Sequence, residues 1–221
     1  MLSDGVIYPL VFADIALFSI QERDLCVLLA RRTNEPEANK WALPGGILKP
    51  KIDDSLDQTA IRVIRDKVGV SAGCVEQVRL FSGETRDPRG YSLSLLYCAL
   101  LSKDQARAVA GLKTSEVRWV QAELATRKEL AFDHGVMIAE ALKYLQGKIE
   151  HRALPLHLLN ATFSLFELQD ACSLILGSPV DKSSFRRRMK NENSIRPVQG
   201  LFREGAYRPA QLYQAVPEFQ F

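Results

Sequence analysis

A glycine-led loop followed by an amphipathic helix holds the residues with the clearest capacity for chemistry. The segment is Trp41–Val70, WALPGGILKPKIDDSLDQTAIRVIRDKVGV. Its second half predicts a helix that Asp54 or Ser55 can cap and that ends at Gly69. Four apolar residues spaced four apart would form its buried stripe: Leu56, Ala60, Ile64 and Val68. Positions 63, 66 and 67 share one helix face, so their side chains can converge on one ligand.

This segment resembles the Nudix box, a loop and helix that bind a diphosphate through a glutamate-held divalent metal. Gly46 and Arg62 stand where that motif has them, but the gap to Asp54, which replaces the first glutamate, is two residues too long. The three metal-facing glutamates are replaced by Val63, Asp66 and Lys67. A hard cation needs several oxygen ligands, and an ammonium repels it. We therefore expect a Nudix scaffold that binds without hydrolysing, with no catalytic residue, metal or cofactor.

The charge of the chain is concentrated in its last third. Residues 1–150 carry 20 Lys and Arg against 20 Asp and Glu, whereas residues 151–221 carry 9 against 6. Five cations and no acid occupy Lys182–Lys190. A run of charge is usually a solvated helix face, but five of one sign without interspersed acids favours an anionic partner.

Composition and cysteine usage indicate a cytoplasmic protein with no membrane partner. Apolar residues make up 47% of the 221 residues, yet no run approaches the roughly 18 apolar residues of a membrane span. The start of the chain has no basic region of the kind that opens a signal peptide. Four scattered cysteines without a C-x-x-C pair are typical of reduced core thiols.

Strand and helix patterns predict an α/β fold for the first 149 residues. Two apolar runs, Tyr8–Ser19 and Leu25–Ala30, predict a hairpin or neighbouring strands. Further strands are expected over Cys74–Ser82 and Tyr91–Leu101, and a closing helix over Asp133–Lys148. Together with the box helix they agree with a Nudix α/β/α sandwich over residues 1–149. The composition changes over residues 150–162, where we expect a linker, and residues 163–221 form a second, small domain.

The second domain has the order of a winged helix-turn-helix. Ser164 and Glu167 form a capping box for a first helix that Gly177 ends. A short turn leads to Asp181, which can cap a cationic helix over Lys182–Asn191. Residues 195–213 then predict a two-stranded wing with its turn region between Gly200 and Gly205.

The cationic helix can present one face to nucleic acid. Phe185 and Met189 lie about 40° apart on a helical wheel and mark the buried side. The opposite side places Ser183 and Arg187 for base edges, while the flanking cations suit phosphates. The predicted DNA-binding residues are Lys182, Ser183, Ser184, Arg186, Arg187 and Lys190, with Arg203 and Arg208 from the wing. A helix that packs on the first domain is the alternative.

A second candidate site lies in the turn before strand Tyr91–Leu101. Arg86 and Arg89 could bind a diphosphate bidentately, although an ordinary Asp-Pro turn explains the same residues. The predicted ligand-binding residues are Arg86, Asp87, Arg89, Gly90, Trp41, Gly46 and Arg31. Trp41 could stack on adenine but suits core packing better, and His134 suits a helix start or the core.

The combination of a degenerate Nudix domain with a winged helix resembles the NrtR family of Nudix-related transcriptional regulators. Further matching segments are Arg86–Gly90, Leu130–His134, Ser184–Arg187 and Arg208–Tyr213. The resemblance implies a homodimeric repressor of NAD-biosynthesis genes that binds a palindromic double-stranded DNA operator and leaves it on binding ADP-ribose or a related metabolite. It would be associated with the nucleoid when bound. The alternatives are a Mg²⁺-dependent ADP-ribose or nucleoside-diphosphate hydrolase with an accessory C-terminal domain, and a Nudix-type sensor of protein or RNA.

Overall fold

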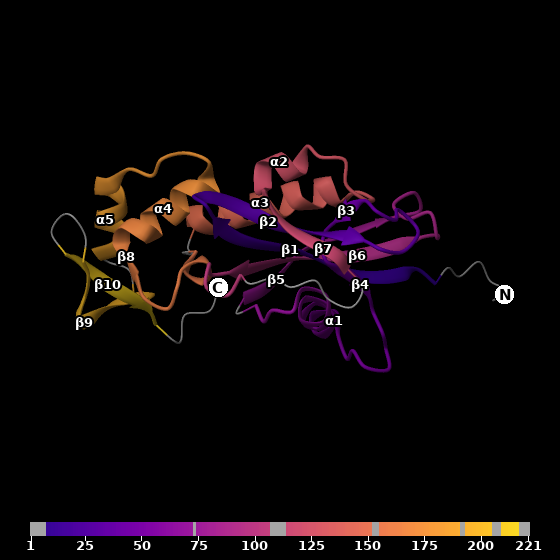
Figure 1. The fold of residues 1–221 in the computed structure, drawn as a ribbon, viewed down its shortest axis with the longest axis horizontal. Helices are drawn as coiled ribbons and strands as arrows, with labels where there is room; N and C mark the ends of the chain where they lie inside the picture. Colours follow the sequence, from indigo (N-terminus) through magenta and orange to yellow (C-terminus); the bar gives the residue numbers. More distant parts are fainter. Residues whose placement is uncertain are drawn as a thin grey trace.

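A larger α/β unit and a smaller unit lie side by side along the molecule (Figure 1). The computed structural model describes residues 8–72, 74–106, 114–151, 155–190, 193–204 and 209–216. The larger unit is a mixed sheet between helices, and the smaller one is a winged helix, as the sequence predicts.

The large sheet is organised around strand β1 (Leu10–Gln21). β1 forms an antiparallel hairpin with β2 (Asp24–Arg32), and their turn residues Glu22 and Arg23 have φ of 47° and 73°. This left-handed pair is the geometry of a tight hairpin turn. β6 (Ser92–Leu101) runs parallel to β1 and antiparallel to β5 (Cys74–Gly83). Three further strands complete the sheet: β3 (Trp41–Ala42), β4 (Gly45–Ile47) and β7 (Thr114–Gln121).

Strand β1 is buried on both faces, which makes the sheet the middle layer of a sandwich. Ile15 and Leu17 belong to the core on one face, whereas Ala16 and Phe18 belong to the core on the other. Successive strand residues point to opposite sides, so an almost continuous apolar run is what such a strand needs.

The box helix covers the first face of the sheet. It consists of α1 (Leu56–Val63) and a π-helical turn, η1 (Ile64–Val68). Ser55 caps its start by accepting from the Gln58 amide, and Gly69 ends it with φ of 75°, as predicted. Ala60, Ile64 and Val68 are buried, so the predicted stripe faces the sheet, with Leu56 partly buried at its edge.

Helices α2 (Ala122–Thr126) and α3 (His134–His151) cover the other face (Figure 1). The apolar side of α3 packs against the sheet through Met137, Ala141 and Leu145, each at most 2% exposed. α2 has too few residues for a periodic pattern, and the sequence analysis missed it.

The small unit contains the predicted helix-turn-helix and wing. Its elements are η2 (Leu156–Leu158), β8 (Phe163–Ser164), α4 (Leu165–Leu176), α5 (Lys182–Lys190), β9 (Ile195–Arg203) and β10 (Ala210–Ala215). The capping box of Ser164 with Glu167 is present, and Asp181 accepts from the Ser184 amide at 2.8 Å. β8 adds a third strand to the predicted two, through pairing with β10.

The predicted turn region of the wing began too early, and its last residue, Gly205, lies outside the described residues. Residues 200–203 lie within β9, where Phe202 and Arg203 pair with Gln211 and Ala210. A glycine inside a strand can mark an irregular register rather than a turn. Gly200 has φ of 71°, and the β9–β10 register shifts between Gln211 and Tyr213.

One hydrophobic cluster runs through both units. Leu142 and Ile149 of α3 belong to the same buried cluster as Cys172, Phe185 and Met189 of the winged helix. Leu156 and Leu158, within the expected linker, are also buried there. The boundary at residues 150–162 stays a prediction, but part of that stretch is packed into the core.

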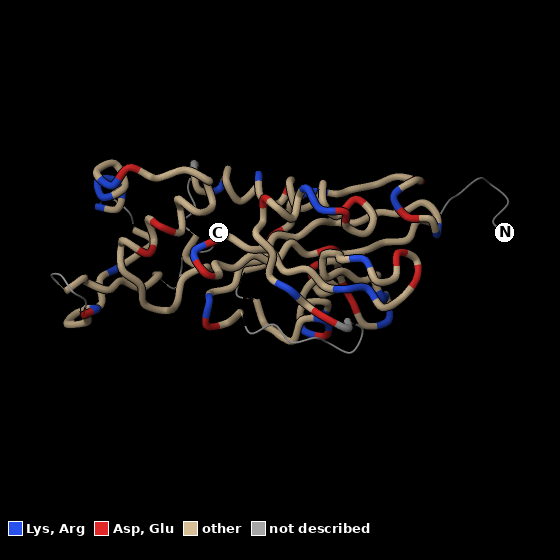
Figure 2. The backbone as a smooth tube through the Cα atoms, turned by 45° about the horizontal axis from the view of Figure 1, so that its top comes forward, with Lys and Arg blue, Asp and Glu red and all other residues tan. Residues whose placement is uncertain are grey.

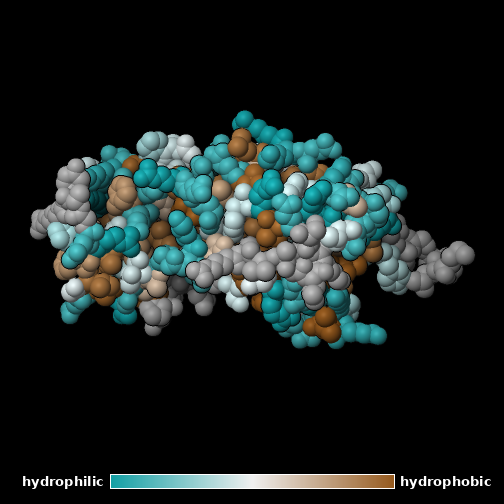
Figure 3. All heavy atoms as spheres, viewed as in Figure 1, coloured by the Kyte–Doolittle hydropathy of each residue, from teal (hydrophilic) through white to brown (hydrophobic). Residues whose placement is uncertain are grey.

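Hydrophilic side chains predominate on one face of the molecule (Figure 3). On the face drawn in Figure 3, hydrophobic side chains are scattered among hydrophilic ones. Within the described ranges, no helix combines the length and apolarity needed to cross a membrane. All four cysteines are unpaired thiols, and three of them are buried.

Candidate functional site

A cavity of about 610 Å³ opens between the box helix, the start of β1 and the start of α3. Phe12, Gly46, Ser92 and His134 are among the residues that line it. Seven cations and four acids also contribute: Arg31, Arg32, Lys49, Arg62, Lys67, Arg86 and Arg89, with Asp14, Glu35, Asp66 and Asp87. Because cations outnumber acids, the cavity suits an anionic ligand.

Asp14 and His134 form the buried polar floor of the cavity. Asp14 is 8% exposed and accepts from the Ser94 hydroxyl at 2.5 Å. His134 accepts from the Leu43 amide through Nδ1 at 2.8 Å, and its Nε2 lies 3.9 Å from Asp14. Burial lowers the pKa of His134 below its ordinary value. The ring is therefore neutral at pH 7 and carries its proton on Nε2, toward Asp14.

The two predicted arginines of the Arg86–Gly90 turn both line the cavity, and both already hold aspartates. Arg86 donates to the two carboxylate oxygens of Asp133 at 2.6 and 2.7 Å. Arg89 binds Asp87 of its own turn at 2.9 and 2.5 Å, and these bonds lower the pKa of Asp87. An incoming diphosphate would have to share or exchange these partners.

Arg32 is a cavity residue that the sequence analysis missed. Its guanidinium donates to the carbonyls of Asn34 and Pro36 and lies 4.7 Å from the ring centre of Phe132. Burial, and then the nearby Arg89, lower its pKa. The adjacent Arg31 and Arg32 at a strand end were the available signal, but alternation alone does not tell which of them turns inward.

Trp41 and Gly90 lie outside the cavity lining. Trp41 packs against the core, with the Arg118 guanidinium 5.0 Å from its ring centre. Gly90, with φ of 135°, closes the turn by donating its amide to the Asp87 carbonyl at 3.1 Å. Their roles in ligand binding stay predictions, whereas Arg31, Gly46, Arg86, Asp87 and Arg89 are brought together around the cavity.

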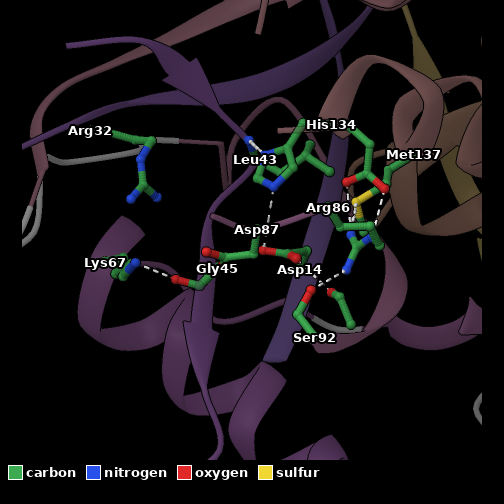
Figure 4. A network of polar contacts seen from close by, with 12 residues as sticks. Asp14, Arg32, Leu43, Gly45, Lys67, Arg86, Asp87, Ser92, His134 and Met137 are labelled. Carbon is green, nitrogen blue, oxygen red and sulfur yellow. Dashed lines mark hydrogen bonds and ion pairs between the residues drawn. The ribbon is translucent and has the colours of Figure 1, made fainter. Parts of the chain in front are cut away.

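Three other residues occupy the positions where the Nudix box has metal-binding glutamates: Val63, Asp66 and Lys67. Val63 is buried, and a methyl group added at Gly46 would lie 2.6 Å from its Cγ2. Asp66 pairs with Arg65 at 2.8 Å. Lys67 donates to the carbonyl of Gly45 (Figure 4). Among the described residues, no group of three or more His, Cys, Asp or Glu side chains could hold a metal ion.

The carboxylate that anchors the box loop is Asp53, the residue before Asp54. Asp53 is 5% exposed, and Arg62 donates to both of its oxygens at 2.7 Å. These bonds hold the pKa of Asp53 far below its usual range. Asp54 is exposed and bonds only locally with Gln58. Adjacent aspartates in a loop cannot be ranked by spacing alone.

Helix α5 presents the predicted cationic face. Phe185 and Met189 are 5% and 7% exposed, whereas the six predicted DNA-binding residues of the helix are exposed: Lys182, Ser183, Ser184, Arg186, Arg187 and Lys190. Figure 2 shows this basic cluster at the end of the molecule away from the N-terminus. Arg188 turns the other way and donates to the Ile149 carbonyl of α3 at 3.2 Å.

The wing holds the other two predicted DNA-binding residues, Arg203 and Arg208. Arg203 forms an ion pair with Glu167, the capping-box acid of α4. This bond gives Arg203 a partner inside the protein, and its contact with phosphate stays a prediction. Arg208 lies outside the described residues.

Comparisons with known proteins match both units. A family profile for the NrtR DNA-binding winged helix domain matches residues 155–215, and one for the NUDIX domain matches residues 11–141. The "ADPR responsive transcriptional repressor NtrR" of Acinetobacter baylyi is 37% identical over 215 residues, which cover 96% of this chain and 85% of that protein. The chain belongs to the NrtR family.

Solved structures of another NrtR protein have the same fold. Crystal structures of Shewanella oneidensis NrtR, alone and complexed with a 27mer DNA, have TM-scores of 0.83 and 0.82. Each is 34% identical and covers 94% of both chains. The NUDIX domain of that protein complexed with ADP ribose has a TM-score of 0.60 at 33% identity, over 65% of this chain and 92% of that domain.

Proposed function

We propose that this protein is a homodimeric transcriptional repressor that binds a palindromic operator through α5 and leaves it when ADP-ribose fills the cavity. The observation that carries the DNA half is the exposed basic face of α5 opposite buried Phe185 and Met189. Arginine on such a face can bind two guanine acceptors in the major groove. Its site of action would be the cytoplasm, at the nucleoid when bound.

The dimer follows from the small size of one recognition surface. A single winged helix reads few base pairs, so two copies in successive major grooves, about 34 Å apart, are needed for a specific site. Two-fold symmetry of the protein then requires a palindromic operator. By family membership the regulated genes would be those of NAD biosynthesis.

The ligand half of the proposal rests on the cationic cavity. Arg31, Arg32 and the Arg86–Arg89 turn surround a space large enough for a nucleotide-sized ligand. Arginine pairs bidentately with phosphate oxygens. The relatives named for ADP-ribose support this ligand among the possible diphosphates.

We further propose that the cavity does not hydrolyse its ligand. Val63 and Lys67 supply no carboxylate where the Nudix box has glutamates, and Asp66 is paired with Arg65. One acid is too few for the oxygen ligands of a divalent cation. The competing hydrolase hypothesis needs a metal site that these residues do not form.

Two assays on the same preparation separate repressor from hydrolase. Duplex DNA from upstream of the protein's own gene should shift on a native gel, and ADP-ribose should reverse the shift. ADP-ribose incubated with Mg²⁺ or Mn²⁺ should stay intact. Turnover on the order of 1 s⁻¹ or faster, which is ordinary for an enzyme, would reject the non-catalytic part of the proposal.

A further inference from the structure

Lys67 occupies a distinctive place at the edge of the cavity. It lies on the helix face of positions 63, 66 and 67, is partly buried, and lines the cavity. Its ammonium points across to strand β4 and donates to the carbonyl of Gly45 (Figure 4). A carbonyl oxygen is the kind of ligand that a hard cation takes. At this oxygen the cation is the Lys67 ammonium, which the chain itself supplies.

On the basis of the proposed function, we propose that Lys67 binds the diphosphate of the effector directly, in the position where a hydrolase would need a metal. Effector binding is then independent of Mg²⁺. The side chain provides one positive charge and three donors. Exchanging the Gly45 carbonyl for a phosphate oxygen replaces a neutral acceptor with an anionic one, which gives a stronger hydrogen bond.

Three neighbouring arginines are already paired with carboxylates. Arg62, Arg86 and Arg89 each hold an aspartate in a bidentate pair. Moving any of them to a phosphate leaves a carboxylate without its partner, which costs free energy. Charge that Lys67 adds at the diphosphate leaves these three ion pairs in place.

The packing around Lys67 fixes its direction. Val63, one turn earlier on the helix, packs directly beneath Gly46. Strand β4 is therefore held close to the helix, and Lys67 can reach from the helix to the strand. A carboxylate at position 63 would add charge beside β4, whereas valine keeps this contact apolar. The site is built for an ammonium and not for a metal with its ligands.

The test is calorimetric titration of ADP-ribose into the full-length protein, in EDTA and in excess Mg²⁺. The parent should give the same Kd in both buffers, within about twofold. Lys67→Ala should weaken binding by about tenfold or more in both, as expected for the loss of a charged hydrogen bond. Lys67→Arg should retain most of the affinity. Lys51→Ala is the matched control, because Lys51 is exposed and outside the cavity lining, and it should bind as the parent does.

Lys67→Glu distinguishes the proposed role of Lys67 from the simple loss of a contact. It should bind poorly in EDTA and recover partly in Mg²⁺, because positions 66 and 67 would then offer two carboxylates. Unchanged binding by Lys67→Ala, or parent binding that needs Mg²⁺, overturns the inference while leaving the proposed effector intact. A parent that binds no ADP-ribose in either buffer rejects the proposed effector and the inference together. Equal thermal melting of all variants keeps misfolding out of the comparison.

Discussion

Arg188 of α5 donates a hydrogen bond to the Ile149 carbonyl of α3, over 3.2 Å. Helix α3 begins at His134 in the cavity lining and ends beneath the winged helix. Its 18 residues span roughly 27 Å. Gln146 adds a second tie, because its side-chain amide donates to the Ile175 carbonyl of α4 at 3.0 Å. One rigid helix therefore touches both the cavity and the DNA-binding unit.

The Arg188 contact should carry part of the coupling between ligand and DNA. Arg188→Ala should keep operator affinity within about twofold, because this side chain faces α3, but should raise the ADP-ribose concentration for half-release severalfold. Operator binding by fluorescence anisotropy at increasing ADP-ribose measures both. Arg186→Ala is the control, and it should weaken DNA binding while leaving the ratio of affinities with and without ligand unchanged. Unaltered release from the Arg188 variant would remove the contact from the coupling.

Arg187 should read sequence. Arg187→Ala should cost about 1–3 kcal/mol on the operator and relax preference at one base position per half-site. Lys190→Ala should weaken specific and random DNA alike and reduce the salt dependence of binding, as the loss of a phosphate contact does. Competition binding on a set of single-base operator variants distinguishes the two. Equal losses on operator and random DNA for Arg187→Ala would show that the assignment of helix faces is wrong.

The close contact between β4 and the box helix should not tolerate a larger side chain. Gly46→Ala places a methyl 2.6 Å from Val63 Cγ2, so it should destabilise the fold by about 1–3 kcal/mol. Val63→Ala in the same chain should recover part of that loss. Gly147→Ala is the control, since its new methyl meets nothing within 4 Å beyond its chain neighbours and the local helix backbone, and it should be neutral or stabilising by about 0.5–1 kcal/mol. Urea unfolding of the parent, the two single variants, the double variant and Gly147→Ala measures these changes, and strict additivity of Gly46→Ala and Val63→Ala would contradict the contact.

Local signals in the sequence were enough to predict the helices that carry the two sites. Ser55 and Gly69 bound the box helix as predicted, and Phe185 and Met189 are the buried side of α5. Each of these features depends on residues within a few positions of one another, where capping and periodicity act.

Features that depend on distant parts of the chain were not predictable in the same way. The Arg86–Asp133 pair joins residues 47 apart, and Lys67 meets a carbonyl 22 residues earlier. Asp53 rather than Asp54 is buried because the loop folds back under Arg62. Side-chain type and spacing do not predict such long-range contacts, so the shape of the cavity could not be predicted from the sequence.

His134 should make stability depend on pH. Its pKa is lowered by burial, and Asp14, Asp133, Arg32 and Arg86 surround it. The unfolded chain binds a proton below about pH 6.5 while the folded chain does not, so the free energy of unfolding should fall as pH drops below that value, by at most about 1.4 kcal/mol per pH unit. Urea unfolding between pH 5.5 and 7.5 should show a shallower decline for His134→Asn than for the parent. His157, half-buried and with its pKa also lowered by burial, accounts for part of the remaining decline. Identical slopes for parent and variant would contradict a neutral buried His134.

Release of operator DNA by ADP-ribose tests the account most directly. A labelled duplex from upstream of the protein's own gene, held with the full-length protein in EDTA, is titrated with ADP-ribose while anisotropy is followed. The ligand must bind the DNA-free arrangement more tightly, because equal affinity for both states shifts nothing. The account predicts a fall to the value of free DNA, and by reciprocity the same operator must weaken ADP-ribose binding by the same factor. Undiminished anisotropy at saturating ADP-ribose would contradict it.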